Sequence, residues 1–300
     1  MNYFVEGLQG AGKSTLVGKL SDRFPRHQVF REGDYNPVEL AWCSYLTKEQ
    51  YEAALGRYVA LTEEMKEKTT FEPAEEAQAE TAAGNAEEAR AETVAGNAEE
   101  ARAETAAGNA KTLGSTVDRY VLTYTRILTD IPGFHKDLED YEIYNGRIPR
   151  EEFEQIILSR YARWHGEDQI FECSILQNIV ENQILFYEMT DDEIVAFYKR
   201  LADVIKDRDF KILYLEVAWV AGALEIIRRE RVDADGNEMW FPLMIGFLEN
   251  CPHGKRHGLK GFDGLVKHLE HRKALELRIL REAFPEHAVI LKSKDYDLDL

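Results

Sequence analysis

A short glycine-rich segment near the amino terminus constrains the fold of this chain more than any other feature. Residues 7–14 read Gly-Leu-Gln-Gly-Ala-Gly-Lys-Ser and match the pattern G-x-x-x-x-G-K-[ST] at every fixed position. The β-prone residues 2–6 before it predict a buried parallel strand. After it, Leu16 and Leu20 lie four residues apart, as on one face of a helix. A strand, a glycine loop and a helix in this order indicate a phosphate-binding loop rather than an ordinary turn.

The residues of this loop suit a nucleoside triphosphate with Mg²⁺. Glycines bring backbone N–H groups close to an anion, and the following helix adds the positive end of its dipole. We expect Lys13 to reach the β- and γ-phosphates, Ser14 to take one Mg²⁺ position and Thr15 to contact the α-phosphate. The residues expected to hold the nucleotide here are Gly7, Gly10, Ala11, Gly12, Lys13, Ser14 and Thr15. No Asn/Thr-Lys-x-Asp signature for guanine is visible, which favours ATP.

The charge balance narrows the classes of partner. The 300 residues include 55 acidic and 37 basic side chains, a net charge of −18, which argues against nucleic acid or an anionic membrane as the main partner. Three widely spaced cysteines, Cys43, Cys173 and Cys251, indicate free thiols in a reducing compartment. No apolar run reaches the ~18 residues of a membrane span. We expect a cytoplasmic protein, with the monomer and the homodimer as open alternatives.

The rest of the chain alternates between strand and helix patterns. Further strands are expected at residues 27–32, 169–172, 211–216 and 287–291, and residues 121–125 also have strand character. Helices are expected from residue 37, carrying Trp42 and Tyr45, and over residues 48–68, 149–164, 190–206, 220–231 and 262–284. These patterns predict one α/β domain over residues 1–300, with a five-stranded parallel sheet covered by helices on both faces, a three-layer α/β/α fold.

Residues 74–109 interrupt this pattern with a repeat. Three nearly identical units of 12 residues, rich in Ala and Glu, each close on Gly-Asn. Units with almost no large apolar side chains cannot bury a core, so we expect an exposed, helical insertion without a part in chemistry. An interaction arm is the alternative, and the near-identity fits either a recent duplication or an engineered insertion.

Carboxylates at the ends of strands are the first candidates for catalysis. In open α/β sheets, ligands bind outside the carboxyl ends of the strands. Glu172 ends a strand, where we expect it to hold Mg²⁺ or act as a base; a structural ion pair is the alternative. Glu32 and Asp34 follow another strand, and either is expected to orient or deprotonate an acceptor hydroxyl, or else to be a solvated loop carboxylate.

Arginine and histidine side chains are the next candidates for contacts with phosphate or metal. We expect Arg228 and Arg231 to close over the γ-phosphate and Arg229 to help bind the nucleotide, because arginines clamp a transferring phosphoryl group. A favourable interaction with the negative helix end is the alternative. His268 and His271 lie three apart on a charged helix and are expected at the surface, not as metal ligands.

Four stretches carry a resemblance to a known family. They are residues 6–15; Arg31-Glu32-Gly33 with Pro37-Val38 and Trp42; residues 171–174 (Phe-Glu-Cys-Ser); and residues 212–216 (Ile-Leu-Tyr-Leu-Glu) leading to 227–231 (Ile-Arg-Arg-Glu-Arg). With these the chain resembles the small-molecule kinases with phosphate loops, particularly the deoxynucleoside kinase and thymidylate kinase branch. The resemblance spans the scaffold apart from the repeat, and its first motif is the specific one.

The resemblance implies a P-loop NTPase fold and an assignment of roles. In that family the second stretch supplies a carboxylate for the acceptor, the third is an acidic-Arg-Ser motif, and the fourth forms an arginine-bearing lid over ATP. Here Cys173 replaces the arginine of the third motif, which puts a nucleoside acceptor in doubt, and Arg126 is a candidate to compensate.

These observations favour an ATP- and Mg²⁺-dependent phosphotransferase acting on a small-molecule acceptor, most simply a nucleoside or nucleotide. The rival is a nucleotide-dependent switch that hydrolyses ATP or GTP slowly, has no acceptor and works on a partner through the repeat. A phosphotransferase that modifies an antibiotic or another metabolite shares the chemistry of the first hypothesis and differs in the acceptor.

Overall fold

The computed structural model describes residues 1–74 and 117–295. Its central element is a five-stranded sheet in which every neighbouring pair is parallel, in the order β2-β6-β1-β7-β8. The strands are β1 (Asn2–Gly7), β2 (Gln28–Phe30), β6 (Gln169–Glu172), β7 (Phe210–Glu216) and β8 (Ala288–Lys292). The predicted five-stranded parallel sheet of an α/β protein is therefore confirmed.

The central strand β1 is buried along its whole length, as its apolar sequence predicts. Phe4 lies opposite Phe171 of β6 and Ile212 of β7 in the sheet register. The Phe4 and Phe171 rings stack with centroids 4.8 Å apart, and Phe30 of β2 stacks on Phe171 at 5.0 Å. This aromatic row fixes the register of three adjacent strands, and so fixes where each of them ends.

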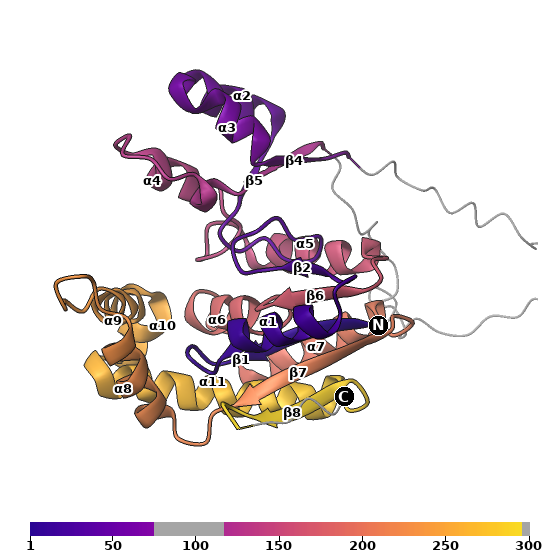
Figure 1. The fold of residues 1–300 in the computed structure, drawn as a ribbon, viewed down its shortest axis with the longest axis vertical. Coiled ribbons are helices and arrows are strands. Elements are labelled where there is room, and N and C mark those ends of the chain that lie inside the picture. Colours follow the sequence, from indigo (N-terminus) through magenta and orange to yellow (C-terminus); the bar gives the residue numbers. More distant parts are fainter. Residues whose placement is uncertain (75–116, 296–300) are drawn as a thin grey trace, which may run out of the picture.

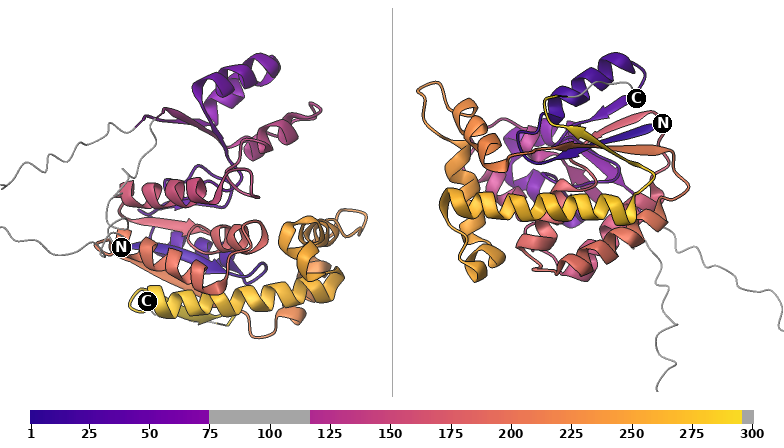
Figure 2. Two further views of the ribbon diagram at one scale, coloured as in Figure 1. Left: turned by 180° about the vertical axis from the view of Figure 1, so that it is seen from behind. Right: turned by 90° about the horizontal axis from the view of Figure 1, so that it is seen from below.

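Helices lie on both faces of the sheet (Figure 2). Helix α1 (Lys13–Arg23) packs against β1 and β6 on one face. The other face carries α5 (Arg150–Arg163), α6 (Gln177–Leu185), α7 (Asp191–Val204) and α11 (Gly261–Ala283). Thr190 caps α7 in a reciprocal capping box with Glu193.

A second, smaller unit was missed by the sequence patterns. Strands β3 (Ser44–Leu46), β4 (Thr69–Glu72) and β5 (Arg119–Leu122) form an antiparallel sheet in the order β3-β5-β4. Helices α2 (Lys48–Arg57), α3 (Thr62–Glu67) and α4 (Phe134–Glu139) and the 3₁₀ turns η1 (Val59–Leu61) and η2 (Tyr124–Arg126) accompany it. Much of this unit has its own apolar cluster, which includes Leu46, Tyr51, Met65, Leu122 and Phe134. It stands at one end of the molecule (Figure 1).

Several expectations near this unit were wrong. No helix begins at residue 37, because the Asn36 side-chain oxygen accepts from the N–H groups of Val38 and Glu39 and holds a turn. Tyr45 lies in β3 and not in a helix, and of the residues 121–125, which have strand character, only Val121 and Leu122 lie in a strand, β5 of the small sheet. The helix expected over residues 48–68 is broken at Tyr58.

Three helices lie beside the carboxyl ends of β1 and β7 (Figure 1). They are α8 (Val220–Glu230), α9 (Trp240–Asn250) and α10 (Pro252–His257). Between α8 and α9, the residues around Asp233 form a turn closed by a bridge between Val232 and Glu238.

Among the described residues, no helix is long and apolar enough to cross a membrane. The repeat predicted over residues 74–109 falls, apart from Ala74, outside the described residues.

Candidate functional site

The glycine loop joins β1 to α1 at the centre of the sheet. Gly7, Gly10 and Gly12 have φ values of 138°, 74° and 96°, in the region that side chains disfavour. A Cβ on Gly7 would lie 2.7 Å from the Leu215 carbonyl oxygen of β7, so the loop needs glycine there for space as well. No side chain caps the start of α1. The first N–H groups of the helix are therefore open to an anion.

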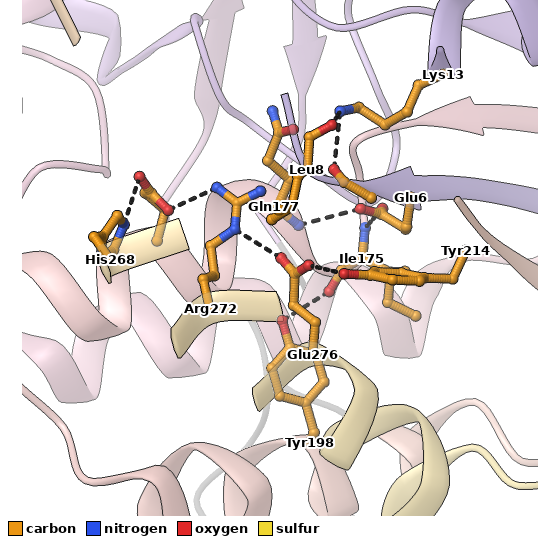
Figure 3. Close-up of polar contacts among 12 residues, drawn as sticks. Glu6, Leu8, Lys13, Ile175, Gln177, Tyr198, Tyr214, His268, Arg272 and Glu276 are labelled. Atoms are coloured by element: carbon orange, nitrogen blue, oxygen red, sulfur yellow. Dashed lines mark hydrogen bonds and ion pairs between the residues drawn. The ribbon is translucent and has the colours of Figure 1, made fainter. Parts of the chain in front are cut away.

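Lys13 folds back over this loop. Its ammonium donates to the carbonyl oxygens of Gly7 and Leu8, each at 2.9 Å, and the residue is 8% exposed. Figure 3 shows the side chain reaching from α1 to the loop. A buried ammonium group whose partners are neutral carbonyl groups interacts more strongly with an anion than an ammonium group in water does.

Ser14 and Glu172 meet beside the loop. The Ser14 hydroxyl donates to a Glu172 carboxylate oxygen at 2.5 Å, and the other carboxylate oxygen lies 3.8 Å from an Arg31 guanidinium nitrogen. Glu172 is 6% exposed at the end of β6, next to β1 in the sheet. A hydroxyl and a carboxylate are oxygen ligands that Mg²⁺ accepts in proteins. The described residues contain no group of three His, Cys, Asp or Glu side chains arranged for a metal, so an ion here needs ligands from elsewhere.

The turn after β2 carries the two other candidate carboxylates. One Glu32 oxygen accepts from the Trp42 indole at 3.2 Å and from the Gln177 amide at 3.0 Å. Asp34 forms an ion pair with Arg126 at 2.8 Å, and the same guanidinium donates to the Glu32 carbonyl at 2.8 Å. Because Phe30 of β2 pairs with Phe171 of β6, Glu32 and Glu172 leave neighbouring strands at the same edge of the sheet.

Arg126 and Cys173 differ in their surroundings. Arg126 follows β5 in the small unit and binds the turn at residues 32–34, so its described contacts are with that turn and not with the glycine loop. Cys173 is buried with a left-handed backbone (φ 59°), and burial raises the pKa of its thiol well above the usual value. A thiol that remains protonated is a weak nucleophile and a weak ligand.

A buried polar network that sequence reasoning missed lies beneath the loop (Figure 3). Glu6 is the next-to-last residue of β1 and accepts from the N–H groups of Ile175 at 2.7 Å and Gln177 at 3.2 Å, at the start of α6. Burial outweighs these hydrogen bonds and raises the pKa of Glu6 to about 7. A glutamate directly after the apolar residues 3–5, in a strand expected to be buried, is the sequence signal that could have found it.

The network continues into α11, where one expectation was wrong. His268 is 2% exposed instead of lying at the surface, and its Nε2 is 3.2 Å from a Glu181 carboxylate oxygen. Arg272 donates to Glu181 at 2.7 Å and lies 3.0 Å from Glu276, which accepts from the Tyr214 hydroxyl at 2.8 Å. Burial disfavours the Glu181 carboxylate, but its interactions with His268 and Arg272 outweigh burial and lower its pKa to about 2. His271 is half-exposed beside Asp191.

Two of the three candidate arginines have described contacts, and these are with Glu238 and with α9, not with the glycine loop. Arg228 donates to Glu238 at 2.6 Å and lies 4.9 Å from the Phe241 ring centroid. Arg231 lies 5.0 Å from the Trp240 ring centroid, and Arg229 is exposed. Two of the three therefore pack on aromatic side chains of α9.

A shallow cavity adjoins the loop on the side of α8. It measures about 200 Å³ and is lined by Gly10, Trp219, Gly222, Ile226, Ser293 and Lys294 among others. The Ser293 hydroxyl donates to the Ala11 carbonyl at 2.8 Å, which ties the segment after β8 to the loop. A larger cavity of about 460 Å³ lies at Phe210 and His287, by the amino ends of β7 and β8 and away from the loop.

In comparisons with known proteins, no family model and no curated protein matches the chain.

Proposed function

We propose that this protein is an ATP- and Mg²⁺-dependent phosphotransferase with the three-layer α/β/α fold of P-loop NTPases. The observation that carries the proposal is the contact between Ser14 and Glu172 beside Lys13, at an uncapped helix start that follows the central strand. A strand-end carboxylate bonded to the hydroxyl of G-x-x-x-x-G-K-[ST] is the arrangement that holds Mg²⁺ against a triphosphate.

The loop residues would bind the triphosphate. Lys13 would exchange its two carbonyl partners for β- and γ-phosphate oxygens, and Thr15 would contact the α-phosphate. The cavity beside Gly10 supports a nucleoside triphosphate rather than a bare phosphate, because Trp219 and Ile226 give it an apolar wall that suits a base.

Ser14 and Glu172 would hold Mg²⁺ together with phosphate oxygens and water. Both residues supply the hard oxygen ligands that this ion prefers, and Arg31 would remain as the outer partner of Glu172. When bound, Mg²⁺ neutralises charge that develops on the transferring group.

Glu32 is the better placed carboxylate for the acceptor. One of its oxygens takes both hydrogen bonds, from Trp42 and Gln177, which leaves the other without a hydrogen bond within the described part of the chain. Asp34 is instead committed to Arg126. Glu32 would therefore orient or deprotonate the acceptor hydroxyl, and Asp34 would hold the turn.

The α8–α9 segment would act as a lid. Arg228, Arg229 and Arg231 would need to leave their present positions to reach a γ-phosphate. The Arg228–Glu238 ion pair is partly exposed and weak enough to be exchanged for a triphosphate, because ion pairs at the surface contribute little. Closure would exclude water from the transfer.

Three buried free thiols fit the cytoplasmic location that belongs to the same proposal.

The test is ATP turnover against a panel of nucleosides, nucleotides and other hydroxylated metabolites. Lys13→Ala should abolish turnover, while Lys48→Ala, at an exposed position on α2, should leave it unchanged. A compound that raises turnover at least tenfold and carries the recovered phosphate would establish the transferase. Slow hydrolysis that depends on Lys13 and that no compound stimulates would instead support the nucleotide-dependent switch.

A further inference from the structure

The part of the site around Glu32, where the phosphate acceptor is proposed to bind, has an unusual set of charged groups. We call it the acceptor side. Three carboxylates, Glu32, Asp34 and Glu172, are accompanied there by two guanidinium groups, those of Arg31 and Arg126. Both guanidinium groups are engaged. Arg126 binds Asp34 and two backbone carbonyl groups, and Arg31 lies 3.8 Å from Glu172. A phosphate on the acceptor would have to break these pairs, so the charge pattern disfavours an anionic acceptor.

Gln177 adds a second observation that points to a ligand. The residue is 6% exposed, and its Nε2 donates to Glu32 at 3.0 Å. Because a carboxylate only accepts, this contact fixes the orientation of the amide. The other amide atom, Oε1, is buried and has no hydrogen-bond partner among the described residues. A buried carbonyl oxygen without a partner at the carboxylate calls for a donor that a ligand can bring.

Trp42 supplies the third element. Its side chain is 48% exposed, although its indole N–H is fixed on Glu32. Its backbone is left-handed (φ 66°), a costly conformation for a bulky residue, and its carbonyl accepts from Thr125 at 3.3 Å. Backbone strain of this kind is concentrated at ligand-binding sites. An exposed indole held against a carboxylate is the combination that binds an ammonium group, through the ring face and the charge together.

We propose that the acceptor is a hydroxylated amine, whose ammonium group is bound by Glu32, the Trp42 ring and the Gln177 carbonyl oxygen. The inference rests on the proposed function, in which Glu32 faces the acceptor. It goes further by giving the acceptor a positive charge and no phosphate, so that Glu32 orients the acceptor through its ammonium group instead of deprotonating its hydroxyl. The strongly acidic chain, with a net charge of −18, also attracts a cationic ligand at long range.

Binding of matched compounds tests this without requiring turnover. Calorimetry with the full chain and the Mg²⁺ complex of a non-hydrolysable ATP analogue would compare glucosamine with N-acetylglucosamine and with glucosamine 6-phosphate, and 2-deoxystreptamine with its N-acetylated form. We expect each free amine to bind at least tenfold more tightly than its acetylated or phosphorylated counterpart. Equal affinities, a preference for the phosphorylated compound, or no binding by either amine up to about 10 mM would overturn the inference.

Variants locate the site. Glu32→Gln should reduce the advantage of the amine at least tenfold and Trp42→Ala several-fold, while Trp42→Phe should keep most of it because an aromatic face remains. Glu52→Gln removes an exposed carboxylate on α2 and should have no effect. An advantage that survives Glu32→Gln would place the amine elsewhere and contradict the inference.

The two proposals fail in different ways. Phosphate transfer that depends on Lys13 but goes only to uncharged acceptors would retain the transferase and reject the amine site. Amine binding that depends on Glu32 without any phosphate transfer would retain the amine site and reject the transferase.

Discussion

The contact between Ser14 and Glu172 joins residues 158 positions apart in the chain. It exists because β1 and β6 are neighbours in the sheet and place the loop after one strand beside the last residue of the other. Neither residue is unusual by itself. Their chemistry comes from meeting at the start of α1, where the helix dipole and Lys13 concentrate positive charge.

Ser14→Ala tests this contact. The change removes one oxygen ligand and leaves Glu172 without its hydroxyl partner. We expect the apparent affinity for Mg²⁺ to fall about 10–100-fold, with the fold retained. ATP binding titrated against Mg²⁺ would measure it. As a control, Ser159→Ala removes a buried hydroxyl in α5. An unchanged Mg²⁺ requirement in Ser14→Ala would contradict the assignment of the metal position.

Glu39 gives a pH-dependent prediction at the residue scale. Burial outweighs a hydrogen bond from the Ala41 N–H and raises the pKa of Glu39 from 4.5 to about 8. The unfolded chain thus loses this proton near pH 4.5, whereas the folded chain retains it until about pH 8. Between these two pH values the folded chain keeps a proton that the unfolded chain has released. The free energy of unfolding therefore falls as the pH rises from about 4.5 to about 8.

Glu39→Gln should remove that loss, because the neutral amide still accepts a hydrogen bond. Relative to the original chain, the variant should become more stable between about pH 5 and about pH 8, by a few kcal/mol at most. Urea unfolding at several pH values would measure the difference, with the exposed Glu52→Gln as reference. A difference that does not change with pH would show that Glu39 is ionised in the folded protein.

At the scale of elements, the glycine loop and α8 are packed against each other. A Cβ on Gly10 would lie 2.2 Å from the Ile227 Cδ1 of α8, and the Gly10 φ of 74° disfavours a side chain as well. The loop is therefore in contact with the helix that carries Arg228 and Arg229. Movement of α8 and the conformation of the loop should be coupled.

Gly10→Ala should both strain the loop and displace α8. We expect a loss of about 1–3 kcal/mol in stability and weaker ATP binding. The matched control is Gly18→Ala in α1, where a Cβ meets nothing within 4 Å, and which should gain about 0.5–1 kcal/mol. Thermal unfolding and ATP titration of both variants would measure this. Equal stability and equal ATP affinity of the two variants would show that α8 does not constrain the loop.

The sequence predicted the parallel sheet well because its strands are continuous apolar runs, such as residues 2–6 and 211–216. It did not predict the small antiparallel sheet. Strand β3 has only three residues, and β4 and β5 are separated by the repeat, so no hairpin pattern was visible. His268 was misplaced for a related reason, because its burial depends on Glu181, which lies far away in the chain.

The candidate site was predicted from the sequence only in part. The loop residues follow a local spacing rule, and in the structure Lys13 folds over the loop and Ser14 contacts Glu172. The phosphate and Mg²⁺ contacts expected of them stay predictions. The positions of the three candidate arginines depend on how α8 and α9 pack, which spacing does not determine, and two of them, Arg228 and Arg231, lie on aromatic rings of α9. Glu6 and Gln177 gain their roles only when β1 and α6 are brought together.

At the scale of the whole molecule, the small unit holds the turn on which we propose that the acceptor binds. Arg126, just after β5, holds the turn that carries Glu32 and Asp34. Glu72 of β4 is bound by the buried Arg160 at 2.6 and 2.7 Å and accepts from Tyr35. Both anchors lie outside residues 75–116. The contribution of the small unit should therefore survive removal of that segment.

A deletion tests this division of the molecule. Glu72 and Arg119 are opposite each other in the β4–β5 pair, and the Ala74 N–H donates to Asp118 at 2.8 Å, so the two chain ends already meet. Replacing residues 75–116 by Asn-Gly, which favours a tight hairpin turn, should leave the folded structure intact and phosphate transfer within about twofold. Circular dichroism and the transfer assay would measure both. A folded variant that binds ATP but has lost its activity would mean that the deleted segment acts in function, as the switch hypothesis requires, whereas an unchanged transfer rate would confine the chemistry to the loop, the strand ends and the lid.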